Sequence, residues 1–64
     1  MKIILPYSTI NIVLEDPASI TSILDKLNIN PSEVIVSRNG KLVPEDTLIS
    51  GDDEIRIIRI AHGG

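Results

Sequence analysis

The chain has 64 residues, among them 13 isoleucines and one tyrosine, with no phenylalanine, tryptophan or cysteine, and its net charge is −3 at pH 7. This length indicates one domain with an aliphatic core, near the lower size limit for folding without disulfides or metals. The absence of cysteine excludes disulfides, thiolate metal sites and a cysteine nucleophile, and a single histidine cannot form a metal site alone. The acidic charge and the near absence of aromatic residues argue against direct nucleic-acid binding.

The sequence also gives no sign of a membrane segment. No basic stretch followed by an apolar one opens the chain, and no apolar run approaches about twenty residues. We therefore expect a cytoplasmic protein that does not enter a membrane.

The first fifteen residues predict an antiparallel hairpin. Residues 1–5 form an apolar run that Pro6 ends, and residues 7–9 would form the turn. Apolar side chains then alternate through residues 10–15, as in a strand with one buried face. We expect the first strand to be the more deeply buried of the two.

One amphipathic helix follows. Asp16 can cap free N–H groups and Pro17 fits the first helical position, so we expect the helix to start there. Residues 28–30 would end the helix, and Pro31 would prevent it from resuming. Apolar residues recur at the spacing of one helical face, which predicts core packing for Ile20, Ile23, Leu24 and Leu27.

The next segment predicts a second hairpin and a final strand. Residues 34–38 form the first arm, Asn39 and Gly40 the turn, and residues 41–43 the return arm. Residues 44–48 would be a loop or a single helical turn, with Leu48 or Ile49 as its apolar anchor. A turn at residues 50–53 then leads into a strand that begins near Ile55, which we expect to be the central one.

A single helix covers only one face of a sheet, which makes the last strand informative. If Ile55 and Ile57 face the helix, then Ile58 and Ile60 face outward together with Arg56. The same parity turns Val34 and Val36 inward and Ile35 outward. The sequence therefore predicts an apolar docking patch of Ile35, Ile58 and Ile60, although singly exposed aliphatic residues are also ordinary.

The chain ends at Gly63 and Gly64, directly after this strand and a short spacer of Ala61 and His62. Neither glycine has a Cβ, so such a tail is thin enough to enter a channel that a side chain would block. Frayed ends and cloning scars are the alternative explanations. We expect residues 1–61 to form the domain and residues 62–64 a flexible C-terminal tail.

Taken together, several segments resemble the ubiquitin-like sulfur carriers of β-grasp fold, both the thiamine-biosynthesis (ThiS-like) and the prokaryotic tRNA-thiolation carriers of the ThiS/MoaD superfamily. This resemblance implies an α+β fold with a mixed four- to five-stranded sheet and one helix packed on one face. Molybdopterin-synthase small subunits share the architecture but are usually longer. The segments that carry the resemblance are residues 27–34, 38–45 and 51–55 and the terminal Gly63 and Gly64.

The resemblance also implies a role for the tail. In these families a ubiquitin-activating-type enzyme adenylates the terminal carboxylate with ATP, and a persulfide donor converts it to a thiocarboxylate. The attachment site would be Gly64, with Gly63 and His62 threading into the activating site. We interpret His62 as a solvated linker residue because no neighbouring carboxylate would orient it as a base. The chain would be a monomeric co-substrate, not an enzyme, and would bind no cofactor or metal.

Further questions stay open at the level of sequence. Arg56 and Arg59 fit either acidic groups on the activating enzyme or cross-strand partners within the sheet. Residues 30–34 favour tRNA thiolation slightly over thiamine thiazole synthesis, and a downstream enzyme of either kind would receive the sulfur. The alternatives are a protein modifier joined to lysines through Gly64, and a plain interaction module whose glycines have no role.

Overall fold

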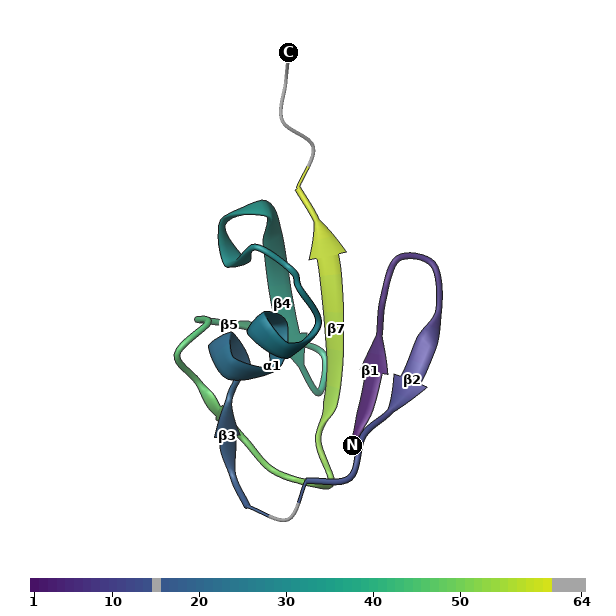
Figure 1. The fold of residues 1–64 in the computed structure, drawn as a ribbon, viewed down its shortest axis with the longest axis vertical. Coiled ribbons are helices and arrows are strands. Elements are labelled where there is room, and N and C mark those ends of the chain that lie inside the picture. The colour runs from purple at the N-terminus through teal and green to yellow at the C-terminus, as the bar shows by residue number, and fades with distance from the viewer. Residues whose placement is uncertain (15, 61–64) are drawn as a thin grey trace.

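The computed structural model describes residues 1–14 and 16–60. Its main sheet has five strands in the order β2-β1-β7-β4-β5, with β1 parallel to β7 and the other neighbours antiparallel. Two short strands, β3 and β6, form a second sheet (Figure 1). The elements in chain order are β1 (Lys2–Ile4), β2 (Thr9–Asn11), β3 (Ala18–Ser19), α1 (Ile20–Lys26), the 3-10 helix η1 (Pro31–Glu33), β4 (Val34–Arg38), β5 (Lys41–Val43), β6 (Leu48–Ile49) and β7 (Glu54–Arg59).

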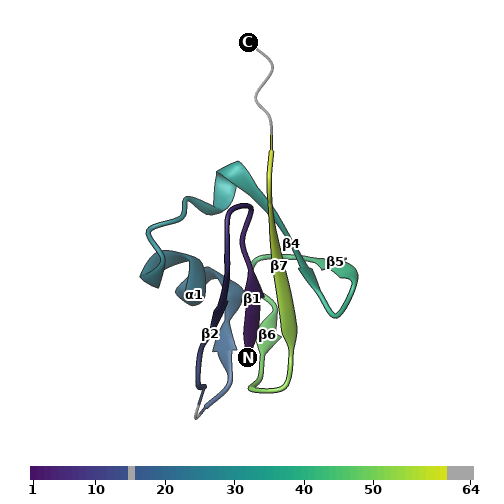
Figure 2. The same ribbon diagram turned by 90° about the vertical axis from the view of Figure 1, so that its right-hand side faces the viewer.

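Helix α1 covers one face of the five-stranded sheet, as expected, and no described element covers the other face (Figure 2). The core between the helix and the sheet is entirely aliphatic, because the chain has no phenylalanine or tryptophan and its one tyrosine, Tyr7, is exposed. Burial of these side chains is the main stabilising term for so small a domain. The buried core consists of Ile3, Ile20, Ile23, Leu24, Val36, Ile49, Ile55 and Ile57.

The start of the helix differs from the prediction. The helix begins at Ile20, not at Asp16 and Pro17, and its N-cap is Ser19, whose side chain accepts a hydrogen bond from the Ser22 N–H at 3.2 Å. The reason is a pairing that sequence proximity does not reveal: Ala18–Ser19 forms strand β3 beside β6. The residues just before the helix therefore belong to a sheet.

The pairing of β3 with β6 also corrects the prediction for residues 44–48, which were expected to be a loop or a helical turn. The end of this segment, Leu48–Ile49, is a strand. Of the two anchors proposed, Ile49 is the buried one and Leu48 is exposed. The segment also holds the helix start, because the Ile20 N–H donates to the Thr47 carbonyl at 3.0 Å.

The other end of the helix follows the prediction more closely. Asn28 has a left-handed φ of 58°, which ends the α-helix where a residue tolerant of that conformation stands. Pro31 does not resume the α-helix, but it does begin the single 3-10 turn η1, for which Asn30 is the N-cap. Proline suits this first position because its missing N–H has no helical partner there.

Both predicted hairpins are present. The Asn39–Gly40 turn has positive φ angles of 51° and 87°, as a tight two-residue turn between twisted strands requires. The first hairpin is shorter than expected, since β2 ends at Asn11, and β1 is the more buried arm, with Ile3 inaccessible to solvent. The longest described α-helix has seven residues, too short to cross a membrane.

Candidate functional site at the end of strand β7

Strand β7 is the central strand, and its two neighbours, β1 and β4, pair with stretches of different length. Strand β1 pairs with Glu54, Ile55 and Arg56 only, whereas β4 pairs along the strand as far as Arg59. One further contact follows, because the Ile60 N–H donates to the Glu33 carbonyl at 2.9 Å. The far end of β7 is therefore held from the β4 side alone.

The residues predicted to carry the chemistry come directly after this point. His62, Gly63 and Gly64 lie outside the described residues, so their roles and the boundary of the tail stay predictions. Chain geometry still limits where they can act. Four residues after Ile60 span at most roughly 14 Å when fully extended. Any reaction at the Gly64 carboxylate must take place within that distance of the end of the sheet.

The alternation predicted for β7 is confirmed. Ile55 and Ile57 are 1% and 3% exposed, while Ile58 and Ile60 are 42% and 38% exposed. Ile35 of β4 is directly opposite Ile58 and is 41% exposed. These three isoleucines, the open-face patch, share the uncovered side of the sheet at the end from which the tail leaves. Their role in docking stays a prediction.

The two arginines lie on opposite faces of β7. Arg56 is exposed on the open face, beside Ile4 of β1 and Ser37 of β4, and forms no ion pair with another described residue. Arg59 has the parity of Ile57 and faces the helix side, where its guanidinium lies 4.0 Å from the Glu33 carboxylate. Of the two kinds of partner considered for these arginines, Arg59 therefore has an acidic partner within the chain. Arg56 is the charged neighbour of the open-face patch.

Two hollows flank the end of β7, and neither could be predicted from the alternation of apolar residues along the chain. The first, about 260 Å³, lies on the helix side between residues 5–8 and residues 28–30, and Glu33 and Arg59 also line it. The second, about 380 Å³, lies where β1 stops and is lined by residues 4–6 and 56–59. The sequence signal for them is Pro6, which lies two residues after the end of β1 and lines both hollows. Within residues 1–14 and 16–60 no group of metal-ligating side chains comes together.

The arrangement as a whole is the β-grasp fold of ubiquitin-like proteins: a mixed five-stranded sheet with one helix across it and the last strand in the centre. The sequence matches the ThiS family model over residues 5–64, and the chain belongs to the ThiS family.

Solved structures agree on the fold. The crystal structure of the thiamine biosynthesis protein ThiS from Geobacter metallireducens superposes with a TM-score of 0.69 at 17% identity, and the match covers 100% of both chains. The solution structure of a thiamine biosynthesis protein from the same organism gives a TM-score of 0.65 at 19% identity, covering 100% of this chain and 88% of that one. No curated protein matches the sequence. At these identities the structural matches establish the fold alone.

Proposed function

We propose that this chain is a sulfur carrier for thiamine biosynthesis, a protein co-substrate rather than an enzyme. The observation that carries the proposal is the position of Gly63 and Gly64, which come four and five residues after the last residue of the central strand of a ThiS-family domain. The last described backbone hydrogen bond before these glycines is donated by the Ile60 N–H to the Glu33 carbonyl. A carboxylate delivered in this way suits chemistry performed inside a partner enzyme.

The proposed reaction explains why a partner is needed. A chain-terminal carboxyl group has a pKa of about 3.3–3.7 and is therefore ionised and a poor electrophile at neutral pH. An activating enzyme would join the Gly64 carboxylate to the α-phosphate of ATP, with release of pyrophosphate. A persulfide sulfur would then attack the carbonyl and AMP would leave. Reduction of the resulting acyl disulfide by a thiol leaves the thiocarboxylate on Gly64, and the chain itself binds no cofactor.

The open-face patch is the proposed docking surface for the activating enzyme. Its three isoleucines form an uncharged area beside the root of the tail, and Arg56 adds a cation that an acidic group of the partner can pair with. A partner bound here keeps its active site within the roughly 14 Å that the last four residues can reach. The downstream partner would be a thiazole-forming enzyme.

The proposed acceptor is thiamine thiazole, not tRNA thiouridine. The family match favours it, and residues 30–34, which suggested tRNA thiolation, have a structural use in this fold: they form the capped turn η1 and the first residue of β4. A deletion strain assayed for thiamine auxotrophy and for tRNA thiouridine separates the acceptors. Loss of thiouridine without auxotrophy would contradict this choice.

The decisive experiment is mass spectrometry of the intact chain. Incubation with a ThiS-activating enzyme, ATP and a persulfide donor should first produce the acyl-adenylate and then raise the mass by the difference between sulfur and oxygen. The matched control is the chain without Gly64, which should fold equally well and remain unmodified. Failure of the wild-type chain to form either adduct would overturn the proposal, and Gly64-dependent conjugates in lysates would favour a protein modifier instead.

A further inference from the structure

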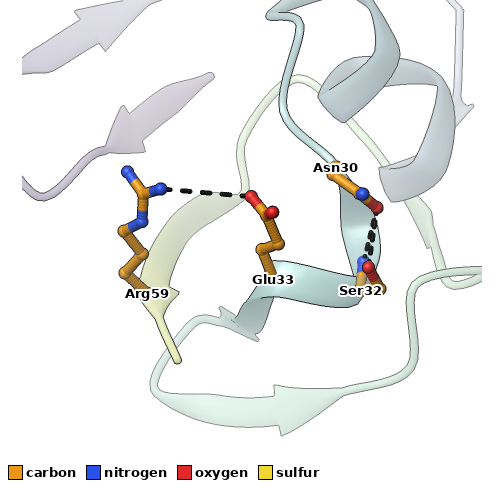
Figure 3. A network of polar contacts seen from close by, with 4 residues as sticks. All are labelled: Asn30, Ser32, Glu33 and Arg59. Carbon is orange, nitrogen blue, oxygen red and sulfur yellow. Dashed lines mark hydrogen bonds and ion pairs between the residues drawn. The ribbon is translucent and has the colours of Figure 1, made fainter. Parts of the chain in front are cut away.

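We propose that Glu33 is a positioning residue that fixes the point at which the reactive tail begins. This inference rests on the proposed function. Glu33 holds the end of β7 by two contacts: its backbone carbonyl accepts the Ile60 N–H at 2.9 Å, and its carboxylate lies 4.0 Å from the Arg59 guanidinium. Figure 3 shows the ion pair beside the turn that carries Glu33. We call these two contacts the Glu33 clamp.

Glu33 is itself held in place by the capped turn η1. The Asn30 side-chain oxygen accepts hydrogen bonds from the Ser32 N–H at 3.0 Å and from the Ser32 hydroxyl at 2.9 Å (Figure 3). The Glu33 N–H donates to the Asn30 carbonyl at 3.0 Å, and β4 begins at the next residue. The clamp therefore connects the end of β7 to a turn that is held by hydrogen bonds of its own.

Loss of the clamp would move the last described anchor of the chain further from Gly64. Hydrogen-bonded pairs alternate along an antiparallel ladder, so the next such pair before Ile60 is Ile58 with Ile35. Without the Glu33 contacts the last described anchor would be Ile58, and the number of residues between the anchor and the end of Gly64 would grow from four to six. The effective concentration of a tethered group falls with the −3/2 power of tether length or more steeply, which predicts at least a roughly twofold loss at the partner's active site.

The two contacts differ in weight. The ion pair is exposed, with 63% and 46% of the Arg59 and Glu33 side chains accessible, and such pairs contribute little. The backbone hydrogen bond is therefore the main component of the clamp. The Arg59 side chain lies on the helix side, away from Ile58 and Ile35, so the ion pair can be removed without altering those docking residues.

A pair of substitutions at one position tests the hydrogen bond. Ile60→Ala and Ile60→Pro both remove the isoleucine side chain, but only proline also removes the N–H donor. In steady-state adenylation by the activating enzyme, we expect Ile60→Pro to lower kcat at least about twofold below Ile60→Ala, with the same KM for the carrier. Equal kcat values for the two variants would overturn the positioning role, because the variants are chosen to differ in the N–H donor of residue 60. A folding defect alone would not lower kcat while leaving KM unchanged.

A second measurement does not depend on the partner. The Ile60 amide of the wild-type chain should exchange with solvent at least several-fold more slowly than in an unstructured peptide, and a peptide-like rate would overturn the clamp. Arg59→Ala should change kcat less than Ile60→Pro does, and Lys2→Ala is its matched control, because the Lys2–Glu54 pair (3.7 Å) lies at the other end of β7. If wild-type protein reacts and the two Ile60 variants match, only the clamp fails; if wild-type protein never reacts, the proposed function fails with it.

Discussion

The two faces of β7 carry the same residue type in opposite environments. Ile55 and Ile57 are buried under the helix, and Ile58 and Ile60 are about two-fifths exposed on the open face. The difference arises from strand alternation together with a single helix, which leaves one side of the sheet without a cover. One strand can therefore contribute to stability with one face and to recognition with the other.

The largest effect that follows from this comparison is on stability. Ile57→Ala should lower the free energy of unfolding by about 2–5 kcal/mol, because it leaves a cavity in a core to which the described residues contribute eight buried side chains. For a domain this small such a loss approaches the whole stability. Urea unfolding followed by circular dichroism measures the change.

The matched variant is Ile58→Ala, one residue further along the same strand. Since Ile58 is exposed, its loss should cost less than about 1 kcal/mol, mainly through strand propensity. Equal destabilisation by the two variants would show that the open face is covered in solution and would contradict the comparison.

The second prediction concerns docking, for which the exposed face of β7 should matter more than the buried face. Ile58→Ala should raise KM for the activating enzyme by about tenfold, the equivalent of roughly 1.4 kcal/mol, if the open-face patch is the docking surface. Leu42→Ala is the control, because Leu42 lies on the same open face but on the edge strand β5, with 67% of its surface exposed. A similar KM for both variants would remove the patch from the interface.

Much of the fold could be predicted because local signals and the global arrangement agree. Asn39 and Gly40 specify a turn with positive φ, and this turn fixes the register of β4 with β5. The alternation in β7 then assigns its faces. The predicted start of the helix was wrong because here the local signal and the global arrangement disagree. Asp16 and Pro17 give the local signal for a helix start, while Ala18–Ser19 pairs with β6, about thirty residues further along the sequence.

The candidate site shows the same division. The exposure of Ile35, Ile58 and Ile60 follows from parity and was predicted. The role of Glu33 could not be predicted, because its main contact is made by a backbone carbonyl with Ile60, and a backbone group carries no side-chain signal. The pairing that brings the two together is a property of the folded sheet.

The smallest expected effect concerns the start of β7, at the end opposite the tail. The Ser50 N–H, at 2.9 Å, and the Asn39 amide, at 3.0 Å, donate to the Asp53 carboxylate and hold its pKa below the usual value of 3.8. A lowered pKa means that the ionised form is favoured by folding, so this stabilisation is present above pH 3.8 and is lost as the pH falls through the folded-state pKa. In wild-type protein the loss should be less than about 1 kcal/mol, because solvent screens this partly exposed group.

Asp53→Asn isolates this contribution to stability from that of the other carboxylates. Its urea midpoint should approach that of the wild-type chain as the solution is acidified below pH 3.8, and the two should separate again at neutral pH. KM for the activating enzyme, measured at neutral pH, should be the same for both proteins, because Asp53 is remote from the open-face patch. A changed KM would mean that the start of β7 also contributes to docking. Recognition would then not be confined to the open-face patch.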